Sequence, residues 1–468
     1  MASDGFFPRW TLRQGGTVAP DERLPWGQTV ALGIQHIFAM FGATVLVPIL
    51  MGFDANTAIF FSGVGTLLFF VVVGGRVPSY LGSSFSFIAV VITATGYSGT
   101  GPNPNIPVAL GGIITAGAVY AAVGVLVMAI GHRWIERLMP PVVTGAVVAA
   151  IGLSLAPVAI RSVSGSPFDT AMGLLTVLAT ALVAVYAPGM LKRLPILLGG
   201  AIGYAIYLAL ANGAGMGKPV DLTALRDAAW IGLPSFTAPV FQANAMLLIA
   251  PVAIILVAEN LGHVKAVSAM TGRDLDRWLG RAFLGDGMAC MVAGAGGGTG
   301  VTTYAENIGV MAVTRIYSTI VFAVAGGMAV LLGFSPKFGA LVATIPQPVL
   351  GGLSMVLFGL IAATGGRIWV QNRVDFSRSR NLITAGVTLT LGAGDLVVKM
   401  GDFSISGIGT ATFGAILLYQ LLRGDGEDDP PPPRPTRRRR CPWNGRTSDR
   451  RCEPHLEIAA GSAPPPAG

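Results

Sequence analysis

The chain has 468 residues, of which 52% are hydrophobic and only 12% are charged. A soluble protein of this size carries roughly 25% charged residues, most of them on its exterior. The composition therefore excludes an ordinary soluble protein and predicts an integral membrane protein, and the mean hydropathy of +0.66 agrees. Three cysteines are too few for a disulfide framework. Residues 1–26 are too polar for a cleavable signal peptide.

The net charge of +8 does not indicate a nucleic-acid-binding surface. The chain has 23 basic and 16 acidic residues up to Arg423, and 8 basic and 7 acidic residues after it. Nearly all of the excess therefore lies in the apolar part, where basic residues in short loops determine membrane orientation. We expect the lipid bilayer as a partner and no nucleic acid.

Taken in chain order, the apolar runs predict an all-helical protein with fourteen membrane segments. A helix needs about 20 apolar residues to cross a bilayer core roughly 30 Å thick. Twelve runs approach or exceed this length: 27–50, 55–74, 107–131, 141–161, 170–188, 194–214, 243–265, 279–297, 318–335, 349–365, 380–398 and 403–422. Two shorter stretches, 84–96 and 306–317, follow small or polar residues and are interpreted as broken helices.

The loops support this count and an orientation with both termini in the cytoplasm. With fourteen segments, thirteen basic loop residues lie inside and five lie outside. The broken segments are then the third and the tenth, so each is the third segment of its half of seven. Because each half has an odd number of segments, the two halves lie in opposite orientations in the membrane. Interrupted helices at corresponding positions of inverted repeats indicate a transporter site near the bilayer midplane. Glycines that merely serve helix packing, together with a re-entrant loop, are the alternative.

The tail from 423 to 468 has a different composition. It contains Pro430 to Pro433, Arg437 to Arg440 and almost no apolar periodicity. Such a composition predicts a disordered segment with polyproline character. The spacing of Cys441, Cys452 and His455 does not match a zinc site, and we expect no metal or cofactor.

Two acidic residues inside apolar runs are the candidate functional groups. Glu259 lies in the eighth segment and Glu306 begins the short tenth one. A charged side chain at the centre of a membrane helix costs about 2.5–3.5 kcal/mol, so function is its default interpretation. Asp286 and Asp395 are weaker candidates, more typical of helix packing or of the interface. His263 lies four residues after Glu259, on the same helix face, as in proton relays. A histidine that bonds a backbone carbonyl is the alternative.

The broken helices predict the kind of ligand. Ser84-Phe85 and Tyr304-Ala305 stand at the starts of the two short helices, where backbone N–H groups are free and the helix dipole is positive. Such donors suit carbonyl oxygens, whereas the two carboxyl groups suit N–H groups. The ligand that satisfies both is small, planar and neutral, as a uracil-like base is.

These residues resemble the nucleobase–ascorbate transporter family, also called the second nucleobase:cation symporter family, and within it the bacterial uracil permeases. The resemblance extends from about Gln28 to Leu422. Its specific motifs are Gln35-His36 with Phe38 to Thr44, Tyr80 to Phe85, Ala258 to His263, and Thr303 to Gly309 continuing to Thr314-Arg315. The last of these is similar to the family signature.

The resemblance implies a seven-plus-seven inverted repeat. By it, 27–131 and 243–335 form a core domain, whereas 132–214 and 336–422 form a gate domain. Residues 1–26 and 423–468 are then the cytoplasmic ends of an inner-membrane protein, and a homodimer forms through the gate domains.

The resemblance also implies residue roles. Glu259 and Glu306 bind the base and couple it to a proton with the help of His263. Phe85 and Ala305 meet its carbonyls through their backbones, next to Ser84 and Tyr304. The supporting residues are Gln35, His36, Asn307, Thr314 and Arg315. Glu306 is typical of the uracil branch, since relatives that carry purines usually have Gln there. Ala305 and Asn260 depart from a common Gly and His, which leaves fine specificity open.

The predicted function is therefore uracil import by a proton symporter. A xanthine or broader pyrimidine permease on the same fold remains the first alternative. An anion exchanger is disfavoured because two carboxylates would repel an anion. A membrane-embedded enzyme would need a nucleophile–base set or metal ligands, and the sequence has no such motif. A non-transporting nucleobase receptor would be distinguished by a flux assay.

Overall fold

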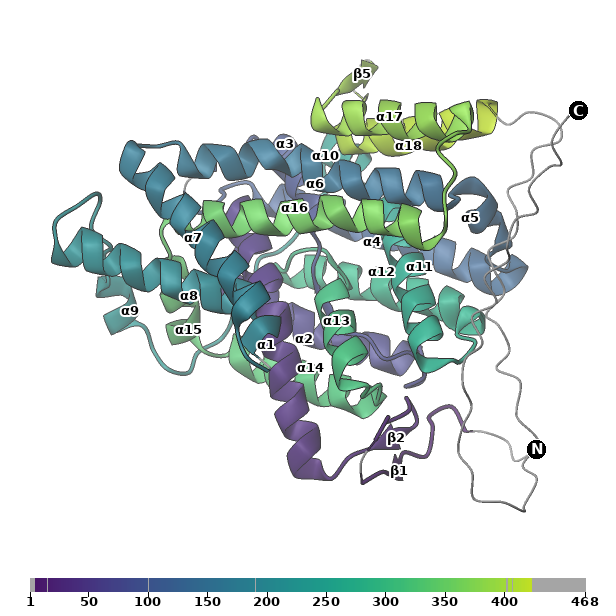
Figure 1. Cartoon of the computed structure of the whole chain (residues 1–468), viewed down its shortest axis with the longest axis horizontal. Helices are drawn as coiled ribbons and strands as arrows, with labels where there is room; N and C mark the ends of the chain where they lie inside the picture. Colours follow the sequence, from purple (N-terminus) through teal and green to yellow (C-terminus); the bar gives the residue numbers. More distant parts are fainter. Residues whose placement is uncertain are drawn as a thin grey trace, which may run out of the picture. The chain divides into compact units, whose positions relative to one another are not determined.

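The computed structural model describes residues 5–14, 16–99, 101–189, 191–400, 403–405 and 407–422. In this part the chain is predominantly helical, and its few strands are at most three residues long (Figure 1). The predicted disordered tail, with its Arg run, Cys441, Cys452 and His455, lies outside the described residues.

One group of helices packs around α12. Its members are α1 (Trp26–Met51), α2 (Ala55–Val72), α3 (Ile88–Thr95), α4 (Ile106–Ile130), α10 (Ala243–Ile249), α11 (Val252–Thr271), α12 (Leu279–Gly296), α13 (Ala305–Thr314) and α14 (Thr319–Gly333). Helix α12 lies against α4 and α2, and α14 lies against α2 and α1. Glycines allow the α4–α12 contact, because a Cβ added at Gly124 would lie 2.4 Å from the Leu284 nitrogen.

A second group packs around α6 and α16, which lie side by side (Figure 1). Its members are α6 (Pro141–Val163), α7 (Pro167–Tyr186), α8 (Pro195–Leu208), the following π-helical turn η3 (Ala209–Gly213), α16 (Gln347–Gln371), α17 (Ser379–Ala393) and α18 (Gly407–Leu421). Helix α16 also contacts α7, and α17 packs against α6 and α18. The core and gate roles that the resemblance implies for the two groups stay predictions.

Short elements join these helices. They are η2 (Leu191–Arg193), α5 (Arg133–Leu138), α9 (Thr223–Asp227), η4 (Asp276–Trp278) and α15 (Pro336–Ala343). Helix α15 follows α14 at a bend of 81°. Pro336 at the first position of α15 explains the break, since proline cannot continue a preceding helix but fits a new helix start.

Every apolar run expected from the sequence coincides with one or more helices. In the described part, however, eight helices are long and apolar enough to cross a membrane, or nine if α14 and α15 form one bent span. Helices α17 and α18, with 15 residues each, are shorter than a usual crossing. A multi-pass helical protein is thus confirmed, whereas the fourteen-segment inverted repeat stays a prediction.

The strands form three two-stranded pairs in the described residues. Strand β1 (Thr11–Leu12) runs parallel to β2 (Glu22–Arg23), and β5 (Val398–Met400) runs antiparallel to β6 (Phe403–Ile405). The third pair, β3 (Leu81–Ser83) with β4 (Val301–Thr303), is antiparallel and buried. It joins the two chain segments that the sequence predicts to be broken.

The N-terminal segment packs against the first helix group. Val18 pairs with the turn after α13, donating its N–H to the Arg315 oxygen at 3.0 Å and accepting from the Tyr317 nitrogen at 2.8 Å. The Trp10 indole donates to the Thr319 hydroxyl at 2.9 Å. Asp21 forms an ion pair with Arg273 at 2.6 Å. The segment therefore connects the ends of α11, α13 and α14.

Candidate functional site

The candidate site is built around the β3–β4 pair. Leu81 pairs with Thr303 and Ser83 pairs with Val301. The ladder continues at each end, with the Ser84 N–H donating to the Gly300 oxygen at 2.9 Å and the Tyr304 N–H donating to the Tyr80 oxygen at 3.0 Å. A short 3-10 turn, η1 (Phe85–Phe87), and α3 follow β3, whereas α13 follows β4. The two helix starts therefore lie at opposite ends of one short ladder.

The Tyr304 side chain holds the β3–β4 pair in place. Its hydroxyl donates to the Ser83 oxygen at 2.7 Å and accepts from the Thr44 hydroxyl of α1 at 3.2 Å. The ring lies against Gly82, where an added Cβ would be 2.5 Å from the ring carbon Cζ. The strands are thus held together by backbone pairing and by a buried side chain that only glycine can accommodate.

One face of helix α11 lies against the β3–β4 pair. Glu259, Gly262 and His263 lie on that face and are partly or fully exposed, whereas Ala258 and Leu261 are buried. The His263 Nδ1 atom lies 2.8 Å from the Thr303 hydroxyl. His263 is therefore positioned by Thr303 of β4.

Helix α13 contributes the second acid. Ala305 is exposed at the start of the helix, and Glu306 is half-buried. Helix α13 packs against α11, the helix that carries Glu259. A Cβ added at Gly262 or Gly309 would meet nothing within 4 Å, so there is open space beside both glutamate-bearing helices.

Phe85 begins η1, and the Ser84 hydroxyl caps this turn by accepting from the Ser86 N–H at 3.3 Å. The Phe85 ring packs edge-to-face on Phe358 of α16, with ring centres 6.0 Å apart. Phe85 thus touches the second helix group, against which α11 also packs through α6 and α18. The structure brings Ser84, Phe85 and the two glutamates to elements that contact one another, since α11 packs against η1, β4 and α13.

The supporting residues lie around α13. The Asn307 amide donates to the His36 oxygen at 3.0 Å and lies 3.0 Å from His36 Nδ1, which ties α13 to α1. Gln35 is buried on α1. Thr314 bonds the Val310 oxygen at 2.9 Å, and Arg315 ends the helix in the left-handed region, with φ of 56°. Asn307 lies in the first turn of α13 and ties it to α1, whereas Thr314 and Arg315 lie at the end of this helix.

A buried cluster of hydrogen bonds surrounds Asp286. Asp286 of α12 is fully buried and accepts hydrogen bonds from the Asn260 amide at 2.7 Å and from the Tyr120 hydroxyl at 3.2 Å. Asn260 also donates to the Tyr120 oxygen at 2.9 Å. The cluster joins α4, α11 and α12, and Asn260 directly follows Glu259. The sequence signal was present, because Asp286 interrupts an apolar run, but its partners come from distant segments.

Replacing Asp286 with alanine should lower both stability and transport. The change leaves one Asn260 amide hydrogen without its buried acceptor, at a cost of about 1–3 kcal/mol. The Tyr120 hydroxyl keeps only the Leu256 oxygen, at 3.2 Å, as an acceptor. We expect a lower melting temperature in detergent and reduced substrate uptake. Asp227→Ala, at an exposed position, is the matched control and should change neither. Equal melting temperatures for the two variants would contradict a stabilising role for the cluster.

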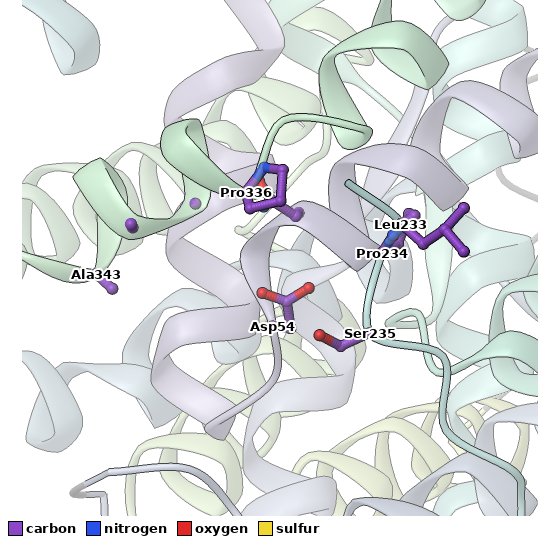
Figure 2. A pocket seen from close by; sticks show the side chains of 9 residues that line it. Asp54, Leu233, Pro234, Ser235, Pro336 and Ala343 are labelled. Atoms are coloured by element: carbon purple, nitrogen blue, oxygen red, sulfur yellow. The ribbon is translucent and has the colours of Figure 1, made fainter. Parts of the chain in front are cut away.

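A separate cavity of about 280 Å³ opens elsewhere on the molecule (Figure 2). It is lined by the start of α2, by residues 233–235 and by α15; its lining residues are Asp54, Asn56, Leu233, Pro234, Ser235, Pro336, Gly339, Ala340 and Ala343. Asp54 is occupied as a helix cap, accepting from the Thr57 nitrogen at 2.9 Å. None of the predicted site residues lines this cavity.

Comparison with known proteins finds relatives that are similar over most of the chain. The chain is 62% identical to the RutG pyrimidine permease of Escherichia coli (strain K12), over 90% of this chain and 96% of that protein. It is 41% identical to the uracil permease of Bacillus caldolyticus, over 85% of this chain and 93% of that protein.

Solved structures with the same fold are more distant in sequence. The transmembrane domain of the cyanobacterial bicarbonate transporter BicA matches with a TM-score of 0.58 and 16% identity, over 84% of this chain and 96% of that one. SLC26A9 matches with a TM-score of 0.62 and 13% identity, over 84% of this chain and 64% of that one. These similarities concern the fold alone. Residues 27–401 match the family described as the Permease family, so the chain belongs to this family of nucleobase–ascorbate transporters, whose members are membrane transporters rather than enzymes.

Proposed function

We propose that the protein imports uracil across the cytoplasmic membrane as a proton symporter that works by alternating access. The observation that carries the proposal is the convergence of two carboxyl groups and two helix starts at the β3–β4 pair. Names of the relatives support the substrate class, since they are permeases for uracil or pyrimidines. Both termini lie in the cytoplasm in this proposal, in agreement with the distribution of basic loop residues.

The chemistry of the site suits a pyrimidine base. Uracil offers two N–H donors and two carbonyl acceptors around a flat ring. Glu259 and Glu306 accept from N–H groups, and the backbone N–H groups of Phe85 and Ala305 donate to the carbonyl oxygens. Charge-assisted hydrogen bonds of this kind are the strong ones in proteins, which favours the two carboxyl groups as the main determinants of affinity.

The same carboxyl groups couple transport to protons. Carboxylates inside a membrane protein are costly to keep charged, so a carboxyl group takes up a proton from the outside when the base binds. The loaded carrier crosses with both, releases the base and the proton inside, and returns without the proton. His263, which is held by the Thr303 hydroxyl, assists the transfer. The proton is thus the coupling ion, and neither a metal nor an organic cofactor is required.

Alternating access uses the two helix groups. The first group, which carries both glutamates, shifts as a core against the second group, which acts as the gate. The Phe85–Phe358 contact crosses between them, so it is expected to change as the substrate site opens to either side. The family resemblance adds a homodimer through the gate helices to the proposal.

A flux assay tests the proposal. Purified protein is reconstituted into liposomes, and uptake of labelled uracil is measured with and without an inward proton gradient. We expect uptake to rise severalfold with the gradient and to collapse when a protonophore is added. Uptake that is indifferent to the gradient would contradict proton coupling. Binding of uracil without any flux would identify a receptor instead of a transporter.

A broader pyrimidine permease is the second candidate, because the relative at 62% identity is named for pyrimidines rather than for uracil. Competition in the same assay separates the two. Unlabelled thymine that inhibits uptake as strongly as uracil indicates the broader range, whereas inhibition by xanthine indicates a site that also accepts purines.

A further inference from the structure

Three arginines gather around one tryptophan at the edge of the first helix group. The guanidinium carbons of Arg76, Arg277 and Arg281 lie 5.9, 5.5 and 5.1 Å from the ring centre of Trp278. Together with Gly5 and Phe6 these residues line a cavity of about 290 Å³. Arg76 comes from the turn after α2, and the other residues of this cluster come from η4 and α12. We refer to this cavity as the arginine cavity.

Among the described residues no carboxylate lines the arginine cavity, although Asp21 is near enough for its charge to act on Arg76. In the described part of the chain, no carboxylate forms an ion pair with these three arginines. Acids in the surrounding loops are already engaged, since Asp21 pairs with Arg273 at 2.6 Å and Asp276 pairs with Lys265 at 2.7 Å. Arg76 donates one hydrogen bond, from Nη2 to the Gly5 oxygen at 2.9 Å, and its Nε atom is buried without a partner. Three like charges in one small cavity favour an anion between them.

The rim of the arginine cavity is apolar. Phe6, which lines the cavity, is 52% exposed, and Phe7, whose ring packs edge-to-face on Phe6 with ring centres 5.0 Å apart, is 40% exposed. Phe7 stacks on Phe70 of α2, with ring centres 5.9 Å apart, so these aromatic side chains are held in place by the helix. Arginine and tryptophan beside exposed apolar groups are typical of the membrane–water interface. A soluble anion would leave this rim in contact with water, whereas a lipid would cover it.

We propose that the arginine cavity binds a phosphate group, and that its source is an anionic phospholipid of the cytoplasmic leaflet. The guanidinium forks of Arg277 and Arg281 bind the phosphate oxygens, and the acyl chains lie along Phe6 and Phe7. Basic cavities between membrane helices on the cytoplasmic side are a known kind of lipid headgroup site. Because the N-terminal segment supplies Gly5 and Phe6, the bound lipid also secures this segment against α2 and α12.

Native mass spectrometry of the full chain in detergent tests this site without any transport measurement. Phosphatidylglycerol, phosphatidylcholine and inorganic phosphate are titrated separately. The R277Q/R281Q variant keeps the Arg76–Gly5 contact and hence the local fold, and R76Q/R277Q/R281Q removes all three charges. R133Q/R137Q/R367Q removes three exposed arginines elsewhere and is the control for overall charge.

We expect phosphatidylglycerol to bind wild-type protein at least tenfold more tightly than it binds either cavity variant, and binding to the control variant to equal that of the wild type. Phosphatidylcholine should bind with the same affinity to the wild type and to all of these variants. Asp4→Asn, at the residue before Gly5, should leave phosphatidylglycerol affinity unchanged or higher. Equal losses in the cavity and control variants would overturn the site. Displacement of phosphatidylglycerol by an equal concentration of inorganic phosphate would overturn the lipid as the source of the phosphate.

Discussion

Replacing Glu306 with glutamine is expected to weaken uracil binding about 10- to 100-fold and to abolish uptake driven by a proton gradient. A hydrogen bond to a charged group contributes about 1.5–3 kcal/mol, which corresponds to this range of affinity. Glutamine keeps the size of the side chain at the start of α13, but it cannot bind and release a proton. The measurements are equilibrium binding of labelled uracil and uptake into proteoliposomes with and without the gradient.

The matched control is Glu136→Gln, the same chemical change at a carboxylate that is 41% exposed and paired with Lys265 at 3.0 Å. An exposed pair contributes roughly 0–1 kcal/mol, so this variant should bind and transport uracil as the wild type does. Glu259→Gln should resemble Glu306→Gln in binding, since both carboxyl groups are assigned to the base. Full gradient-driven uptake by Glu306→Gln would exclude this carboxyl group as the proton carrier.

The second large effect on stability and transport is expected from a substitution in the β3–β4 pair. In Gly82→Ala the new Cβ would lie 2.5 Å from both the Thr44 hydroxyl and the Tyr304 ring, which is closer than real contacts allow. Tyr304 cannot move without losing its hydrogen bond to the Ser83 oxygen. Overpacking of this kind costs about 1–3 kcal/mol. We expect a lower melting temperature and the loss of uracil uptake, because displacement of Tyr304 also displaces the start of α13.

Gly327→Ala is the control for this substitution. Gly327 lies inside α14, and a Cβ added there meets nothing within 4 Å. Alanine is favoured over glycine in a helix by about 1 kcal/mol, so this variant should be as stable as the wild type or slightly more so. If Gly82→Ala and Gly327→Ala had the same melting temperature and the same uracil uptake, the prediction that the β3–β4 pair cannot accommodate a side chain at position 82 would be wrong.

Much of the site was predictable because charge is scarce in this chain. Glu259 and Glu306 stand out in apolar runs, and the polar residues before 84–96 and 306–317 mark the two helix breaks. Asp286 also stands out in an apolar run, but the sequence indicates only a role in helix packing for it. Its hydrogen bonds come from Tyr120 and Asn260, which lie 166 and 26 residues away in the chain and contact it only after folding. The close packing of the N-terminal segment against α13 and α14 was likewise invisible in its mixed, polar sequence.

By itself the sequence determined the class of protein and the positions of its helices, because hydrocarbon thickness sets how long an apolar run must be. It also determined where helices break, since small and polar residues cannot continue an apolar span without protein or water around them. Only the tertiary structure decided that β3 pairs with β4, joining Ser83 to Tyr304 across 221 residues. The physical reason is that such pairing depends on long-range packing around Gly82, and no local pattern encodes which distant strand will supply the partner.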